Sequence, residues 1–147
     1  GEMRVSGDGP KGDGWHVGVD DPRVALQERK LALVLRLDGR SVATSGNYRN
    51  RYEVDGQTLV HTFDPRTGRP VQTDVLSATV ISSDCQTADG AATTLMVMRY
   101  EEGRQWVERH PDLEAGWIVQ RGDQWVLEQS KGFSPYVEYV SAPFASQ

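Results

Sequence analysis

Short hydrophobic runs separated by glycine-containing turns dominate the first half of the chain and predict β-strands. Residues 15–19 alternate large and small side chains, and residues 30–37 form a strong apolar run. Asp38 and Gly39 follow this run and predict a hairpin turn, because glycine adopts positive φ at little steric cost. Residues 40–46 would then be the returning strand.

The strand–turn–strand pattern is repeated between residues 50 and 63, around Asp55 and Gly56. Residues 31–63 therefore predict an antiparallel meander of about four strands. The motif DPRTGRP at residues 64–70 interrupts this pattern. Its proline presets φ at the second position of a turn and its glycine can close the turn, so the meander is expected to end here.

The middle of the chain changes from strand to helix signals. Residues 76–82 predict one more strand, and Asp84 is a suitable N-cap for a helix. The alanine, leucine and methionine content of residues 86–98 predicts that this is the main helix. Residues 103–109 predict a minor helix that stops before Pro111, because proline disrupts a helix interior.

The last third of the chain predicts one hairpin and a tail. Residues 116–120 and 124–129 are strand-like and flank a Gly-Asp turn, whereas residues 131–147 are expected to be peripheral. The resulting fold class is α+β: an antiparallel sheet with one main helix and one minor helix.

Composition excludes several classes of protein. The 147 residues are 37% hydrophobic and 25% charged, as in ordinary globular domains, and no apolar run approaches the roughly 20 residues that span a bilayer. The net charge of −5, without a dense basic run, argues against nucleic acid as the main partner. Cys85 is the only cysteine, so an internal disulfide and a thiolate metal cluster are excluded, and we expect it to be a small buried residue.

Asp89 and Thr93 are the first candidates for chemistry. They lie four residues apart in the predicted main helix and therefore share one face. Mg²⁺ prefers oxygen ligands and usually takes only a few from the protein, so a carboxylate and a hydroxyl one turn apart would suit it. Alternatively, Asp89 offsets the helix dipole and Thr93 is neutral filler. The small residues 90–92 between them would let another group approach the helix closely.

A histidine and a small turn are the second candidates. His61 lies near the end of a predicted strand and either transfers protons or is a surface strand residue. Thr44, Ser45 and Gly46 either hold a nucleophile, or bind a ligand oxygen through backbone N–H groups, or form a plain turn. The motifs G-x-S-x-G and P-loop are absent. The glycine-rich residues 7–14 lack phosphate-loop spacing and predict a flexible loop.

Five motifs occur in an order that resembles the ApbE family, the FAD:protein FMN transferases. They are GEMRVSG, WHVGVDDPR, ATSGNYRNRYEVDG, HTFDPRTGRPV and ADGAATTLMVM. The resemblance extends from Gly1 to about Gln129 and covers the C-terminal half of a typical member. The abrupt start of the chain, without Met or a polar leader, agrees with this. Residues 1–147 are therefore expected to be the C-terminal part of a flavin transferase domain whose N-terminal half is absent from this chain.

The resemblance implies a metal site and a catalytic residue. Asp89 and Thr93 would be side-chain ligands of Mg²⁺, and Ala92 stands where some members have a second aspartate, so that one possible ligand is missing. His61 matches the histidine needed for transfer.

The resemblance also implies a flavin site. Phe63 would contact the flavin through its backbone, and Ser45 and Gly46 would help to shape the site. Arg66 and Thr67 would hold the turn that positions His61 and Phe63, although Arg66 could instead meet phosphate.

The implied reaction is Mg²⁺-dependent transfer of FMN from FAD to a Ser or Thr hydroxyl of an acceptor protein, with release of AMP. Two alternatives remain: hydrolysis of FAD to FMN and AMP, or a non-catalytic flavin-binding module. Because a glycine-rich flavin motif of the family would precede Gly1, the chain alone is expected to be inactive. The resemblance further implies an extracytoplasmic, periplasmic location, with membrane attachment only through an N-terminal lipoprotein anchor absent from this chain.

Overall fold

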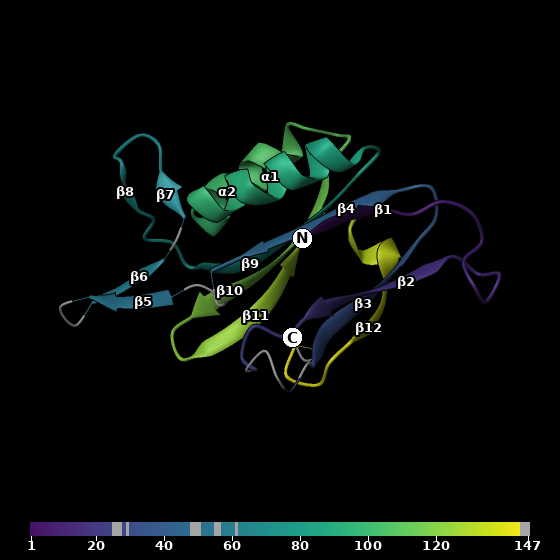
Figure 1. Cartoon of the computed structure of the whole chain (residues 1–147), viewed down its shortest axis with the longest axis horizontal. Coiled ribbons are helices and arrows are strands. Elements are labelled where there is room, and N and C mark those ends of the chain that lie inside the picture. Colours follow the sequence, from purple (N-terminus) through teal and green to yellow (C-terminus); the bar gives the residue numbers. More distant parts are fainter. Residues whose placement is uncertain (25–27, 29, 48–50, 55–56, 61, 145–147) are drawn as a thin grey trace.

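Two antiparallel sheets and two helices make up the body of the protein (Figure 1). The computed structural model describes residues 1–24, 28, 30–47, 51–54, 57–60 and 62–144, with the backbone alone for the strands within 51–60. The five-stranded sheet has the order β1 (Glu2–Arg4), β4 (Ser41–Gly46), β9 (Val75–Ser82), β10 (Glu114–Arg121) and β11 (Gln124–Gln129). The three-stranded sheet has the order β12 (Val137–Val140), β3 (Leu31–Leu37) and β2 (Trp15–Asp20).

Two smaller strand pairs and the helices complete the described part. The pairs are β5 (Arg51–Val54) with β6 (Gln57–Val60), and β7 (Phe63–Asp64) with β8 (Arg69–Pro70). The helices are α1 (Cys85–Val97), α2 (Tyr100–Glu108) and a short 3₁₀ helix at Ser134–Tyr136. None of the described helices combines the length and the apolar character that crossing a bilayer requires.

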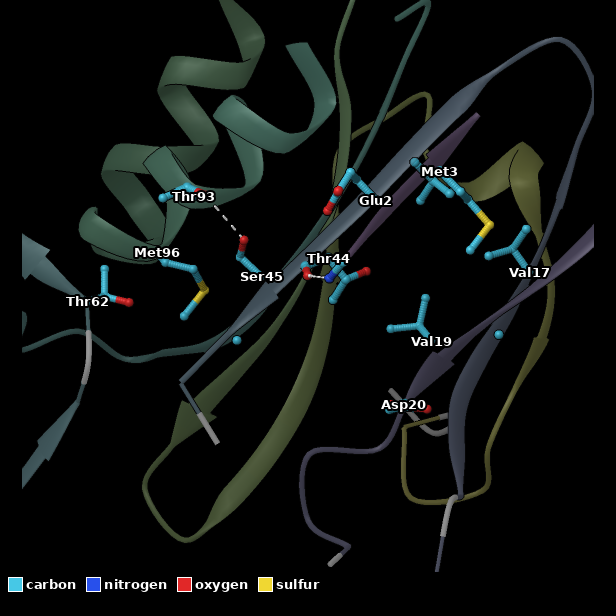
Figure 2. A pocket seen from close by; sticks show the side chains of 14 residues that line it. Glu2, Met3, Val17, Val19, Asp20, Thr44, Ser45, Thr62, Thr93 and Met96 are labelled. Carbon is cyan, nitrogen blue, oxygen red and sulfur yellow. Dashed lines mark hydrogen bonds between the residues drawn. The ribbon is translucent and has the colours of Figure 1, made fainter. Parts of the chain in front are cut away.

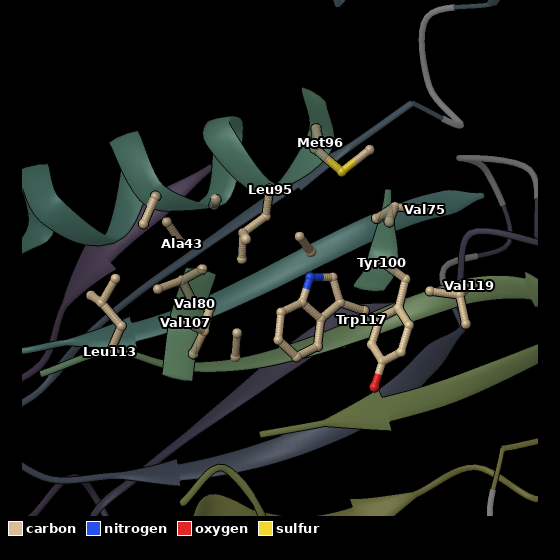
Figure 3. Close-up of a cluster of buried hydrophobic side chains, with 14 of the residues drawn as sticks. Ala43, Val75, Val80, Leu95, Met96, Tyr100, Val107, Leu113, Trp117 and Val119 are labelled. Carbon is tan, nitrogen blue, oxygen red and sulfur yellow. The ribbon is translucent and has the colours of Figure 1, made fainter. Parts of the chain in front are cut away.

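The five-stranded sheet is the middle layer of the fold. The two helices cover one of its faces and the three-stranded sheet lies on the other side (Figure 1). Every residue of the central strand β9 is buried, as expected for a strand covered on both faces. In the helix-side core, Leu95 and Met96 of α1 lie over the sheet, where Trp117 is fully buried (Figure 3). The α+β fold class predicted from the sequence is therefore confirmed.

The predicted meander is wrong, because β3 and β4 belong to different sheets. β3 pairs with β2 and β12, whereas β4 pairs with β1 and β9. Gly39 has a φ of 59° and does form a tight turn, but this turn carries the chain from one layer to the other. Leu37 before the turn and Val42 after it then lie in the same core cluster between the sheets. Alternating apolar residues indicate a strand and not its partner, so the sequence pattern could not distinguish the two arrangements.

The N-cap of α1 was predicted from neighbouring residues, whereas the cap of α2 comes from a residue distant in the sequence. Asp84 is the N-cap of α1 and accepts a hydrogen bond from the Thr87 N–H at 2.8 Å, as predicted. Helix α2 begins three residues earlier than predicted, at Tyr100. Its first N–H donates to the Asp74 carboxylate at 3.0 Å, so this helix is capped by a residue 26 positions away.

The C-terminal tail is not peripheral, and Cys85 is not buried. Strand β12 pairs with β3, and Phe133 is 0% exposed in the core between the sheets. Gly116 of β10 provides the space for this ring, since a Cβ atom there would lie 2.6 Å from the Phe133 Cε1.

Cys85 is half-buried at the start of α1.

Candidate functional site

A cavity of about 460 Å³ lies where the two sheets meet without pairing. Strands β1 and β2 both border it, and each has a single described partner, so two open strand edges face the cavity. The end of β4, helix α1 and Thr62 form the rest of the wall (Figure 2). Its volume is in the range of ligand pockets, about 300–1,000 Å³.

Two predicted site residues from distant segments meet in this wall. The Ser45 Oγ lies 3.4 Å from the Thr93 Oγ1, within hydrogen-bond range (Figure 2). Ser45 is half-buried on β4, and Thr93 is exposed on α1. Ala91 and Ala92 are buried between α1 and the sheet, so the small residues of this helix allow the sheet itself to approach closely.

Asp89 lies one turn before Thr93 on the same helix, and both side chains are exposed. Asp89 is the fifth residue of α1, and the first turn contains no acidic residue. This position weakens the alternative in which Asp89 offsets the helix dipole, because that effect fades beyond the first turn.

The donors available for a metal are all oxygens: the hydroxyls of Thr93 and Ser45 in the cavity wall, and the Asp89 carboxylate one turn away on α1, which is not among the described residues that line the cavity. Within the described residues, no three His, Cys, Asp or Glu side chains cluster as a metal site would require. A hard cation that draws most of its ligands from water and substrate phosphate fits this sparse oxygen set, and Mg²⁺ is such a cation.

The β7–β8 turn lies next to the cavity wall and is held by its own side chains. Asp64 accepts hydrogen bonds from the Arg66 Nε and Nη2, both at 3.0 Å, which lower the pKa of the Asp64 carboxyl below its usual value. The Thr67 hydroxyl is 3.5 Å from the Asp64 carbonyl and accepts from the Arg69 N–H. Arg66 and Thr67 thus hold this turn, as the resemblance implies, whereas the positioning of His61 lies outside the described residues.

Arg66 also reaches Glu102 of α2 at 3.4 Å, which links the turn to the body of the protein. Phe63, at the start of the turn, is 57% exposed. Gly46 lines the cavity at the end of β4. His61 lies outside the described residues, and Thr62, which follows it in the sequence, contributes to the cavity wall.

Two residues near the cavity were missed by the sequence analysis. Glu2 of β1 contributes to the wall, and its side chain points toward the Ser45 side of the cavity (Figure 2). Asn47 follows β4 and is only 4% exposed. Glu2 lies inside the first of the five motifs, so the motif itself was the available signal.

Comparison with known proteins decides the family. The profile of the ApbE family matches residues 1–117.

This chain belongs to the ApbE family.

The relatives of this ApbE chain include two transferases and a protein of known structure. It is 36% identical over 137 residues to the FAD:protein FMN transferase of Vibrio cholerae serotype O1, an alignment that covers 93% of the chain and 40% of the relative. It is 37% identical over 130 residues to the FAD:protein FMN transferase of Escherichia coli K12, covering 85% and 36%.

The structure of the flavin transferase ApbE from Vibrio cholerae superimposes with a TM-score of 0.75 at 34% identity, covering 92% of this chain and 42% of that one. The ApbE fold extends over nearly all of this chain. The chain spans about 40% of the length of these relatives.

Proposed function

We propose that the complete gene product transfers FMN from FAD to a hydroxyl of an acceptor protein, and that these 147 residues supply part of the site. The observation that carries the proposal is the meeting of Thr93 and Ser45 in the cavity wall of a chain with the ApbE fold. Curated relatives of this chain are named FAD:protein FMN transferase, which supports the same reaction.

Asp89 and Thr93 are our proposed Mg²⁺ ligands. A bound Mg²⁺ would neutralise charge on the pyrophosphate during phosphoryl transfer. Both side chains project from one rigid helix whose buried alanines are packed on the sheet, so their spacing is fixed before substrate binds. Position 92 is an alanine and is fully buried, so it offers no metal ligand, and Asp89 is the carboxylate of this helix turn.

The flavin would occupy the cavity between the sheets. Ser45 and Gly46 at the end of β4 would border it, and the backbone of Phe63 in the neighbouring turn would contact it. The cavity wall also contains valine and methionine side chains from β1, β2, β4 and α1, which provide apolar contact for a planar ring.

The proposed reaction exchanges one phosphoester partner for another. The acceptor Ser or Thr oxygen forms a bond to the FMN phosphorus while the bond from that phosphorus to the bridging pyrophosphate oxygen breaks. The electron pair leaves with AMP, and the hydroxyl proton passes to a base. His61 is our candidate for this base, on the basis of the sequence motif.

The metal assignment is tested in the complete gene product with Asp89→Asn and Thr93→Val. Both variants should weaken Mn²⁺ binding in the presence of FAD, measured by electron paramagnetic resonance, and reduce flavinylation of an acceptor by at least about a hundredfold. Thr94→Val is the matched control, because the Thr94 hydroxyl donates to the Gly90 carbonyl at 2.8 Å within the same helix. Metal binding that is equal in Asp89→Asn and Thr94→Val would refute the assignment.

The alternatives are separated by the products. Free FMN that forms from FAD without acceptor indicates a hydrolase, whereas covalent flavin on the acceptor indicates a transferase. FAD binding without either product indicates a non-catalytic flavin-binding module. We also propose an extracytoplasmic, periplasmic location, which fractionation of cells that express the complete gene product would test.

A further inference from the structure

The side chain of Asn47 is buried where strand β4 ends. It is 4% exposed and lies two residues after Ser45, and its backbone N–H donates to the Leu76 carbonyl at 3.0 Å. A buried amide is costly unless its polar atoms are paired. The Asn47 Oδ1 accepts a hydrogen bond from the Thr62 hydroxyl at 2.9 Å.

Thr62 is therefore held from two sides. Its side chain is bound to Asn47, and its carbonyl accepts the Val71 N–H at 3.0 Å. Thr62 also forms part of the cavity wall. The hydrogen bond to Asn47 thus fixes the β7 segment relative to the end of β4, where Ser45 faces the same cavity.

The β7–β8 pair alone holds Phe63 weakly. β7 has two residues, and the partner of Phe63 is Pro70, which has no N–H to donate. The position of the Phe63 backbone consequently depends on its flanking anchors: Thr62 before it, and the Asp64 turn after it.

We propose that Asn47 is a positioning residue for flavin binding, which acts by holding Thr62 and thereby the Phe63 backbone against the cavity. The proposal rests on the proposed function, because it takes the cavity to be the flavin site. Asn47 itself is buried, and among the described residues its side chain acts on the ligand through Thr62.

The test compares variants that break this hydrogen bond with one that keeps it, in the complete gene product. Asn47→Leu and Thr62→Val remove one partner each, and each should raise the FAD dissociation constant about tenfold, as measured by quenching of flavin fluorescence. Thr62→Ser keeps the hydroxyl that donates to Asn47, so it should remain within about threefold of wild type. The double variant Asn47→Leu/Thr62→Val should be no worse than either single variant.

A matched control separates positioning from general stability. The Thr73 hydroxyl donates to the Met98 carbonyl at 2.7 Å, away from the cavity, so Thr73→Val should lower the unfolding temperature without changing FAD affinity. If Asn47→Leu and Thr62→Val behave like Thr73→Val, Asn47 has only a structural role and the proposal is overturned.

Amide exchange tests the hydrogen bond without any flavin. Breaking it should accelerate exchange of the Val71 amide at least about fivefold and leave the central strand β9 unchanged. If wild-type protein does not bind FAD, the proposed function fails and flavin positioning fails with it, while Val71 exchange still shows whether Asn47 holds the segment. Unchanged Val71 exchange in Asn47→Leu overturns the proposal whatever the flavin result.

Discussion

Replacement of Phe133 by alanine should destabilise the protein far more than its place in the C-terminal tail would suggest. The ring is 0% exposed between the two sheets and packs on Gly116 of β10. Truncation of a fully buried phenylalanine costs about 3–5 kcal/mol, which is a large share of the roughly 5–15 kcal/mol by which domains are stable.

The assay is urea unfolding followed by tryptophan fluorescence, with Phe63→Ala as the matched control. Phe63 is the same residue type but is 57% exposed, so its truncation should cost less than about 1 kcal/mol. A difference of less than about 1 kcal/mol between Phe133→Ala and Phe63→Ala would refute the reasoning.

The contact between Phe133 and Gly116 gives a second check with a defined sign. A methyl group at Gly116 would lie 2.6 Å from the Phe133 Cε1, so Gly116→Ala alone should cost about 1–3 kcal/mol through overpacking. In the Phe133→Ala background the methyl group meets a cavity, and the same change should cost less. Equal costs in both backgrounds would show that the two residues do not compete for space.

Three further predictions concern charged and capping groups. Hydrogen bonds to Asp13 and Glu138 raise the pKa of His16. The stability that this group contributes is therefore present below about pH 6.5 and is lost as the pH rises through the raised pKa. The loss of unfolding free energy caused by His16→Gln should accordingly become smaller as the pH rises over this range. Burial, assisted by Glu128, raises the pKa of Tyr100 to about 12. Absorbance titration at alkaline pH should show a tyrosine that ionises late, and this late step should be missing in Tyr100→Phe. Asp74→Ala should destabilise the protein by about 1–2 kcal/mol in urea unfolding, because it removes the acceptor for the first N–H of α2.

Two local features of the candidate site were visible in the sequence because they depend on spacing. Asp89 and Thr93 share a helix face through their separation alone, and the DPRTGRP motif specifies a turn closed by Gly68, whose φ is 64°. What the sequence could not show is that Ser45 meets Thr93, since 48 residues separate them. That contact exists because β4 lies beside β9 under α1, and the pairing of strands depends on the whole fold.

The sequence by itself determined the elements whose signals lie within a few residues: the Asp84 cap, the β10–β11 hairpin and the β7–β8 turn. Their hydrogen bonds join near neighbours, so residue type and spacing suffice to specify them. Only the tertiary structure decided that β3 and β4 part into different sheets, that Phe133 belongs to the core, and that Asn47 holds Thr62. An apolar run or a polar side chain is compatible with many distant partners, and the packing of the whole chain selects one of them.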